Sequence, residues 1–121
     1  MSTKSSAATA LLLRLIGDDP QAADDVLTLA AVSDDPSVLV AAGLLAQDNS
    51  YLERAGERAL TVRDRQLVVL ARAHLEHRRD LFDVLVRDHL ADHPDHLLAA
   101  WIAGRSDHLN THHSHSQKKV N

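Results

Sequence analysis

The chain contains no cysteine, and this absence excludes a disulfide framework, a thiolate metal site and a cysteine nucleophile. Aromatic residues are scarce: there is one Trp, one Tyr and one Phe among 121 residues, so the core must be built mainly from Leu, Ala and Val. A core rich in Leu and Ala favours helices over strands. The four glycines form no glycine-rich loop of the kind that binds phosphate.

Neither the charge nor the hydropathy of the chain points to a nucleic acid or a membrane. Thirteen basic and seventeen acidic residues give a net charge of −4, and they are interspersed, whereas nucleic-acid binding requires a basic patch. The apolar run 10–16 contains Arg14 and makes a poor signal sequence, and no segment approaches the ~20 apolar residues of a membrane span. We therefore expect a cytoplasmic protein. The excess of Arg over Lys and of Asp over Glu resembles GC-rich bacterial coding.

Residues that break or start helices recur about every fifteen residues along the chain. The breaks centre on Asp19, Asp34, Asn49, Asp64, Arg79 and Pro94. Asp19-Pro20 and Asp35-Pro36 each place a side-chain acceptor at the N-cap and a proline at the first helical position. Asn49 and Ser50 are also suitable caps. Between the breaks the apolar residues follow helical periodicity, so each block predicts a helix of about three turns.

These blocks predict an all-α fold of about seven helices. Short loops make neighbouring helices antiparallel, and a shift of about thirty residues aligns the apolar pattern with itself, which is typical of hairpins stacked as a short α-solenoid. Helix 36–47 is apolar nearly all round and should be the central one. We expect a single helical domain over 1–109. The His-rich polar tail 110–121, which contains His112, His113 and His115, should be disordered.

The segment from Asp18 to Gly104 resembles tetratricopeptide-repeat proteins. The motifs that carry the resemblance are Asp35-Pro36 at a helix start, Thr61 with Arg63 in a turn, and His93-Pro94 at a helix end. In these motifs the chain is most similar to the opening part of bacterial proteins of the tetratricopeptide repeat protein 38 type. The resemblance implies a solenoid that recognises other proteins, and it brings no catalytic chemistry with it.

We therefore expect a non-enzymatic protein-interaction module that binds a peptide or a partner helix in a groove. The inner helices of the hairpins should supply the partner-binding residues, which we predict to include Leu67, Leu70, Arg72, His74 and Arg78. The Asp pairs fall at caps and first helical turns, where the helix dipole accounts for them, so a catalytic acid-base pair is not expected. A small hydrolase using Asp and His remains a third interpretation.

The alternative function is that of a His-based protein that binds a divalent metal. His89 and His93 have the i, i+4 spacing of helical zinc ligands, and His96 follows closely, so these three are the candidate ligands. The competing interpretation places His74 and His89 at the edge of the core, with a ring nitrogen bonded to a side chain or water. It places the remaining histidines of the stretch, His77, His93 and His96, at helix ends. On that interpretation the protein carries no metal or other cofactor.

The last predicted helix has an apolar face and no following hairpin to cover it. Repeat arrays need polar terminal caps, so this face must either fold back on the previous hairpin or be buried in a second copy of the chain. The second arrangement makes a homodimer. Its interface would contain Leu97, Leu98, Trp101 and Ile102.

Overall fold

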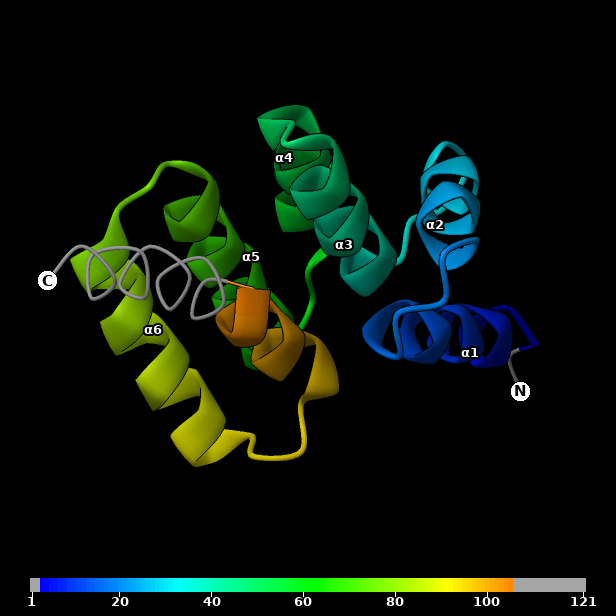
Figure 1. Ribbon diagram of the computed structural model, residues 1–121. Coiled ribbons are helices and arrows are strands. Elements are labelled where there is room, and N and C mark those ends of the chain that lie inside the picture. Colours follow the sequence, from blue (N-terminus) through cyan, green and yellow to red (C-terminus); the bar gives the residue numbers. More distant parts are fainter. Residues whose placement is uncertain (1–2, 106–121) are drawn as a thin grey trace, which may run out of the picture.

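A computed structural model describes residues 3–105, with side chains from residue 8 onward (Figure 1). Its helices are α1 (Thr3–Ile16), α2 (Ala22–Ala30), α3 (Pro36–Ala46), α4 (Asn49–Arg58), α5 (Val62–Leu75) and α6 (Arg79–Asp92). A seventh helical segment covers 97–105. Residues 3–105 contain no strand, which confirms the all-α prediction. The predicted disordered tail, 110–121, lies outside the described residues.

The helices pair as three successive hairpins, α1/α2, α3/α4 and α5/α6, which follow one another across the molecule (Figure 1). Helix α3 contacts α1, α2, α4 and α5, and every residue from Val38 to Leu44 is buried. This confirms that the apolar helix 36–47 is the central one. A helix that is apolar all round, as α3 is, can only be stable when neighbouring elements cover every side of it.

The same turn closes each of the three hairpins. Its central residue adopts the left-handed conformation, with φ of 68° at Asp18, 53° at Gln47 and 59° at His77. In each case the next residue donates its N–H to a carbonyl five positions back over 3.0 Å, as in the Schellman motif. The three pairs are Asp19 with Arg14, Asp48 with Gly43, and Arg78 with Ala73. Because the turns lie about thirty residues apart, the predicted period has a structural counterpart.

Two helix starts show how the sequence predictions fared in detail. Asp35 caps α3 by accepting the Ser37 N–H over 2.9 Å, with Pro36 at the first helical position, as expected. At α4 the expected caps were Asn49 and Ser50, but Asp48 takes this role and accepts the Ser50 N–H over 2.9 Å. Asp48 is the cap because it follows the left-handed turn and has extended backbone, the conformation of an N-cap.

Two further helix starts, those of α5 and α2, lie a few residues away from the predicted breaks. Thr61 caps α5 through a 3.0 Å hydrogen bond from the Asp64 N–H, so Asp64 lies inside the first turn and not at the break. Asp19 accepts the Gln21 N–H over 2.9 Å in the turn before α2, and the helix itself begins at Ala22. Asp19 therefore organises the turn before α2 and is not its N-cap.

A close approach of α3 and α4 depends on a glycine. A Cβ built on Gly43 would lie 3.0 Å from Leu52 Cδ2, 3.2 Å from Tyr51 Cβ and 3.3 Å from the Asp48 carbonyl oxygen. Gly56, also within a helix, would place its Cβ 3.9 Å from the nearest atom, on Val68. Of these two glycines, packing requires only Gly43.

An arginine on α4 joins the first two hairpins. Its guanidinium donates to the Ala30 carbonyl over 3.1 Å and to the Ser33 carbonyl over 3.4 Å, so half-buried Arg54 satisfies backbone groups at the end of α2. Positive charge at a helix C-terminus is also favourable to the helix dipole. These two hydrogen bonds connect α4 to the preceding hairpin.

The 97–105 segment folds back on the chain instead of projecting from it. Leu98, Ala99 and Ile102 belong to the common core, with 4%, 0% and 0% of their surface exposed. Of the two arrangements expected for this apolar face, the fold-back is the one observed. None of the described helices has both the length and the apolar character needed to cross a bilayer.

Candidate functional site

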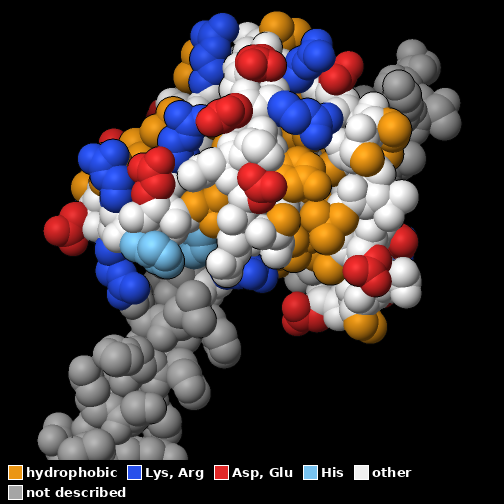
Figure 2. All heavy atoms as spheres, turned by 90° about the horizontal axis from the view of Figure 1, so that it is seen from above, with side chains coloured by type: hydrophobic (Ala, Val, Ile, Leu, Met, Phe, Trp, Pro, Cys, Tyr) orange, Lys and Arg blue, Asp and Glu red, His pale blue; other side chains and the backbone are white. Residues whose placement is uncertain are grey.

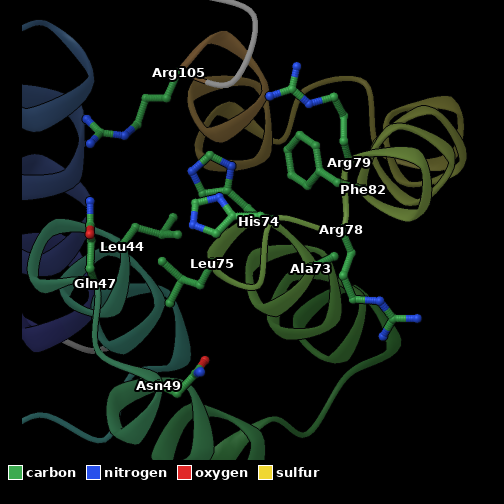
Figure 3. A pocket seen from close by; sticks show the side chains of 11 residues that line it. Leu44, Gln47, Asn49, Ala73, His74, Leu75, Arg78, Arg79, Phe82 and Arg105 are labelled. Carbon is green, nitrogen blue, oxygen red and sulfur yellow. The ribbon is translucent and has the colours of Figure 1, made fainter. Parts of the chain in front are cut away.

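A pocket of about 370 Å³ lies at the end of the second and third hairpins (Figure 3). The end of α3 and the start of α4 form one side of it. The last turn of α5, the first turn of α6 and the end of the 97–105 segment form the other. Its lining consists of Leu44, Gln47, Asn49, Ala73, His74, Leu75, His77, Arg78, Arg79, Phe82 and Arg105.

The inner part of the pocket is apolar. Leu44 from α3 and Leu75 from α5 approach each other in the middle of the lining, and Phe82 lies across from them (Figure 3). The ring of His74 packs against that of Phe82 with centroids 5.3 Å apart. This floor suits the aliphatic or aromatic part of a ligand.

The lining includes three arginines, Arg78, Arg79 and Arg105, and contains no Asp or Glu. Figure 3 shows Arg79 and Arg105 on the side of the 97–105 segment, whereas the guanidinium of Arg78 points away from the pocket. Arg78 also lies 4.0 Å from Glu76, at the outer limit of an ion pair. Arg105 is held 4.8 Å from the centroid of the Trp101 ring, which orients it by a cation–π contact.

One histidine of the pocket, His74, has a shifted pKa. The pKa of His74 lies below its ordinary value, first because the ring is partly buried and then because Arg105 and His77 are close. A bound anion would oppose the effect of Arg105 and raise that pKa. Binding of an anion and protonation of His74 therefore favour each other.

The first turn of α6 adds a further electropositive contribution. The N-cap, Arg78, makes no side-chain cap hydrogen bond, so this helix start lacks the carboxylate or hydroxyl acceptor found at α3, α4 and α5. The first amides of a helix carry the positive end of its dipole. Arg79 and Phe82 extend from this same turn into the lining. An anionic ligand would meet both the arginines and this helix end.

The structure separates the predicted partner-binding residues into three groups. Leu67 and Leu70 have no exposed surface, so they hold α5 in the core and offer nothing to a partner; this part of the prediction is wrong. Arg72 is exposed but lies outside the pocket lining. His74 and Arg78 both line the pocket. The reason for the error is that α5 packs against α3, α4 and α6, so its apolar stripe faces inward.

Polar lining residues that only the structure brings to a binding site include Gln47, His77 and Arg105. The Arg78-Arg79 pair in a predicted turn was the one signal that could have indicated an electropositive site. Arg105 is far from the others in sequence and reaches them because the 97–105 segment folds back. No pattern in the sequence connects it with α3.

A second polar group lies inside the protein, between α5, α6 and the 97–105 segment. His89 is 1% exposed; its Nδ1 lies 2.7 Å from Gln66 Oε1 and its Nε2 lies 2.7 Å from Nδ1 of His96, which is 4% exposed. His89 was expected at the edge of the core with a ring nitrogen bonded to a side chain or water; the bond to a side chain is present, but the ring lies inside the core and not at its edge. Burial first of all lowers the pKa of both histidines, to about 4 for His96.

The three candidate metal ligands do come together, but not as a metal site. The ring of His89 lies 5.0 Å from that of His93 and 4.9 Å from that of His96, between centroids. The facing nitrogens of His89 and His96 are spent on one hydrogen bond, and no set of three or more His, Cys, Asp or Glu side chains within the described residues could hold a metal ion. His77 and His93 lie at helix ends, as expected. His96 precedes a helix but is also buried, which was not predicted.

The residues predicted for a dimer interface have different environments. Leu98 and Ile102 are covered by the chain's own core, whereas Leu97 is 52% exposed and Trp101 is half-buried. Dimerisation through this segment stays a prediction.

On the face shown in Figure 2, basic and acidic side chains intermix, with apolar side chains between them.

Comparison of the chain with models of known protein families, with curated proteins and with solved structures produced no match. The pocket and the buried histidine pair are therefore interpreted from their own geometry.

Proposed function

We propose that the protein is a non-enzymatic interaction module, built as a short tetratricopeptide-like array of hairpins, which binds a peptide segment of a partner protein through an acidic group. The observation that carries the proposal is the pocket itself: an apolar floor bordered by Arg79 and Arg105, with no carboxylate in the lining. Guanidinium groups bind carboxylates through two parallel hydrogen bonds, so a C-terminal or side-chain carboxylate is the group that fits.

The repeated turn at Asp18, Gln47 and His77 supports the tetratricopeptide-like part of the proposal, because it marks three equivalent hairpins. Contact of α3 with α5 adds to this support, since it joins the first helices of successive hairpins as a solenoid does. The cytoplasmic location expected from the composition stays part of the proposal.

The test is selection from a library of displayed peptides with free C-termini, followed by affinity measurements on the enriched peptides. Enrichment of Asp, Glu or a terminal carboxylate next to an apolar residue is expected. Binding should weaken at high salt, because exposed charges are screened. It should also fall at least tenfold in the double variant Arg79→Ala/Arg105→Ala, since each charged hydrogen bond contributes ~1.5–3 kcal/mol.

Arg87→Ala is the matched control, since Arg87 is an exposed arginine of α6 outside the pocket lining. It should leave the affinity unchanged. Selection of peptides without acidic groups, or equal losses in Arg87→Ala and in the pocket variant, would refute the proposed recognition.

A further inference from the structure

The buried hydrogen-bonded chain joins three separate parts of the fold. Gln66 comes from α5, His89 from α6, and His96 from the residue just before the 97–105 segment. Both links are short, at 2.7 Å, and the link between the histidines is buried. The chain is therefore the polar attachment between the last helical segment and the α5/α6 hairpin.

The donors and acceptors of this chain limit how many protons it can hold. Gln66 Oε1 can only accept, so Nδ1–H of His89 donates to it, and the unprotonated Nε2 of His89 accepts from Nδ1–H of His96. One added proton can be accommodated if the His96 proton moves to its Nε2, because a charged His89 donates from both nitrogens. A second added proton forces two N–H groups to face each other, and the contact breaks.

The surroundings of the pair also oppose its charged state. Arg63 on α5 and His93, which follows α6, lower the pKa values by repulsion, while Asp92 and Asp95 raise them in part. The 97–105 segment carries a single charged side chain, Arg105, which lies in the pocket lining. Burial is the largest cause, and together with these charges it lowers the pKa of His96 to about 4.

The 97–105 segment, which this hydrogen-bonded chain of side chains holds in place, completes the pocket. Leu98, Ala99 and Ile102 dock it on the core, and its far end brings Arg105 to the lining next to Trp101. Loss of the attachment at His96 would free the start of this segment. The segment, and Arg105 with it, would then be held by its apolar contacts, those of Leu98, Ala99, Ile102 and half-buried Trp101.

We propose that Gln66, His89 and His96 form a proton-controlled latch, which holds the 97–105 segment in place while both rings are neutral and releases it when both are charged. Release withdraws Arg105 from the pocket and exposes Trp101. The loss of the pocket's ligand on release rests on the proposed function; the latch itself does not.

Proton linkage sets the expected pH dependence. In the released state both histidines regain an ordinary pKa of ~6.5. Because burial keeps both docked rings neutral, the released state binds up to two protons that the docked state does not. Below that pH, and above the pKa values of the docked rings, the ratio of released to docked molecules should rise by up to ~100-fold per pH unit. A single titrating histidine would give ~10-fold.

The test uses Trp101, the only tryptophan, as a reporter on the full chain. Its emission and its quenching by acrylamide are followed from pH 7.5 to 4, with circular dichroism to record the bulk helix content. In the wild type, Trp101 should become exposed between about pH 6 and 4 while most of the helix content remains, with a slope close to two protons.

Two isosteric variants locate the effect. His96→Asn keeps a donor near the position of Nδ1 and does not titrate, so the slope should fall to one proton or less. Gln66→Glu places a carboxylate against Nδ1 of His89 and lets the docked state keep one proton, which also lowers the slope and moves the midpoint to lower pH. Arg87→Ala, at an exposed residue of α6 outside the pocket lining, should titrate like the wild type.

Each unfavourable result is decisive. The latch is excluded if Trp101 stays protected down to pH 4, if it becomes exposed only together with loss of all helix content, or if both isosteric variants titrate like the wild type. Should His96→Asn fail to fold at pH 7.5, as judged by circular dichroism, the Gln66→Glu titration decides alone. Loss of the latch would leave the peptide-binding proposal to stand or fall on its own experiment at pH 7.5.

Discussion

Substituting Gly43 by Ala sets two opposing effects against each other, and the structure decides which is larger. In a helix interior alanine is better than glycine by up to ~1 kcal/mol. Against this, the new Cβ would lie 3.0 Å from Leu52 Cδ2, 3.2 Å from Tyr51 Cβ and 3.3 Å from the Asp48 carbonyl. Leu52 is fully buried, and the other two atoms belong to or adjoin the backbone, so none can move freely.

Relief of these contacts requires α3 and α4 to separate by a few tenths of an ångström. Overpacking of a well-packed core costs ~1–3 kcal/mol, which exceeds the propensity gain, so we expect Gly43→Ala to be destabilised by about 1 kcal/mol. Because Leu44 lines the pocket, the same variant should also weaken ligand binding. A displaced α3 end would move that side chain.

Gly56→Ala is the matched control, because its Cβ would meet only a Val68 methyl at 3.9 Å on an exposed face of α4. Here the propensity gain is unopposed, and we expect a stabilisation of about 0.5–1 kcal/mol. Urea unfolding followed by circular dichroism measures both; with an m value of ~1–3 kcal/mol per M, the two midpoints should differ by roughly 0.5–2 M. A Gly43→Ala protein as stable as the Gly56→Ala protein would refute the close approach of α3 and α4.

Three other outcomes are expected from urea unfolding. Gln47→Gly should stabilise the protein by about 0.5–1 kcal/mol, because glycine adopts the left-handed conformation of this turn without a steric cost; a loss of stability would contradict the assigned φ. Arg54→Ala should cost about 1–3 kcal/mol through its lost bonds to the end of α2, whereas exposed Arg58→Ala should cost at most ~0.5 kcal/mol; equal losses would argue against that tie. His96 is buried neutral with a pKa of about 4, below its unfolded value of 6.5, so its contribution is complete above pH 6.5 and is lost as the pH falls to 4. The loss should reach about 3 kcal/mol in the wild type and be absent from His96→Asn; parallel pH profiles would contradict the assignment.

The number and order of the helices, and the identity of the central one, could be predicted from the sequence. These features depend on local chemistry: periodic Leu and Ala define each helix, and residues such as Asp35 and Pro36 define a start. Exact boundaries were less predictable. Thr61 and not Asp64 caps α5, because an N-cap residue needs extended backbone and Thr61 has it, whereas Asp64 lies in the first helical turn.

The sequence indicated only part of the candidate site. Of the residues predicted to bind a partner, His74 and Arg78 line the pocket, and their role in binding stays a prediction. Leu67 and Leu70 were assigned to a binding groove, yet both are fully buried. An apolar stripe looks the same in the sequence whether it faces a neighbouring helix or a ligand, and only the packing of α5 distinguishes the two.

The sequence by itself determined that this protein is helical, that its hairpins recur about every thirty residues and that α3 is central, because these properties follow from interactions between residues close together in the chain. Only the tertiary structure decided that Arg105 joins Arg79 around one pocket and that His96 bonds to His89 inside the protein. Both arrangements depend on the fold-back of residues 97–105. That fold-back results from burial of Leu98 and Ile102 against distant helices, and no local pattern encodes it.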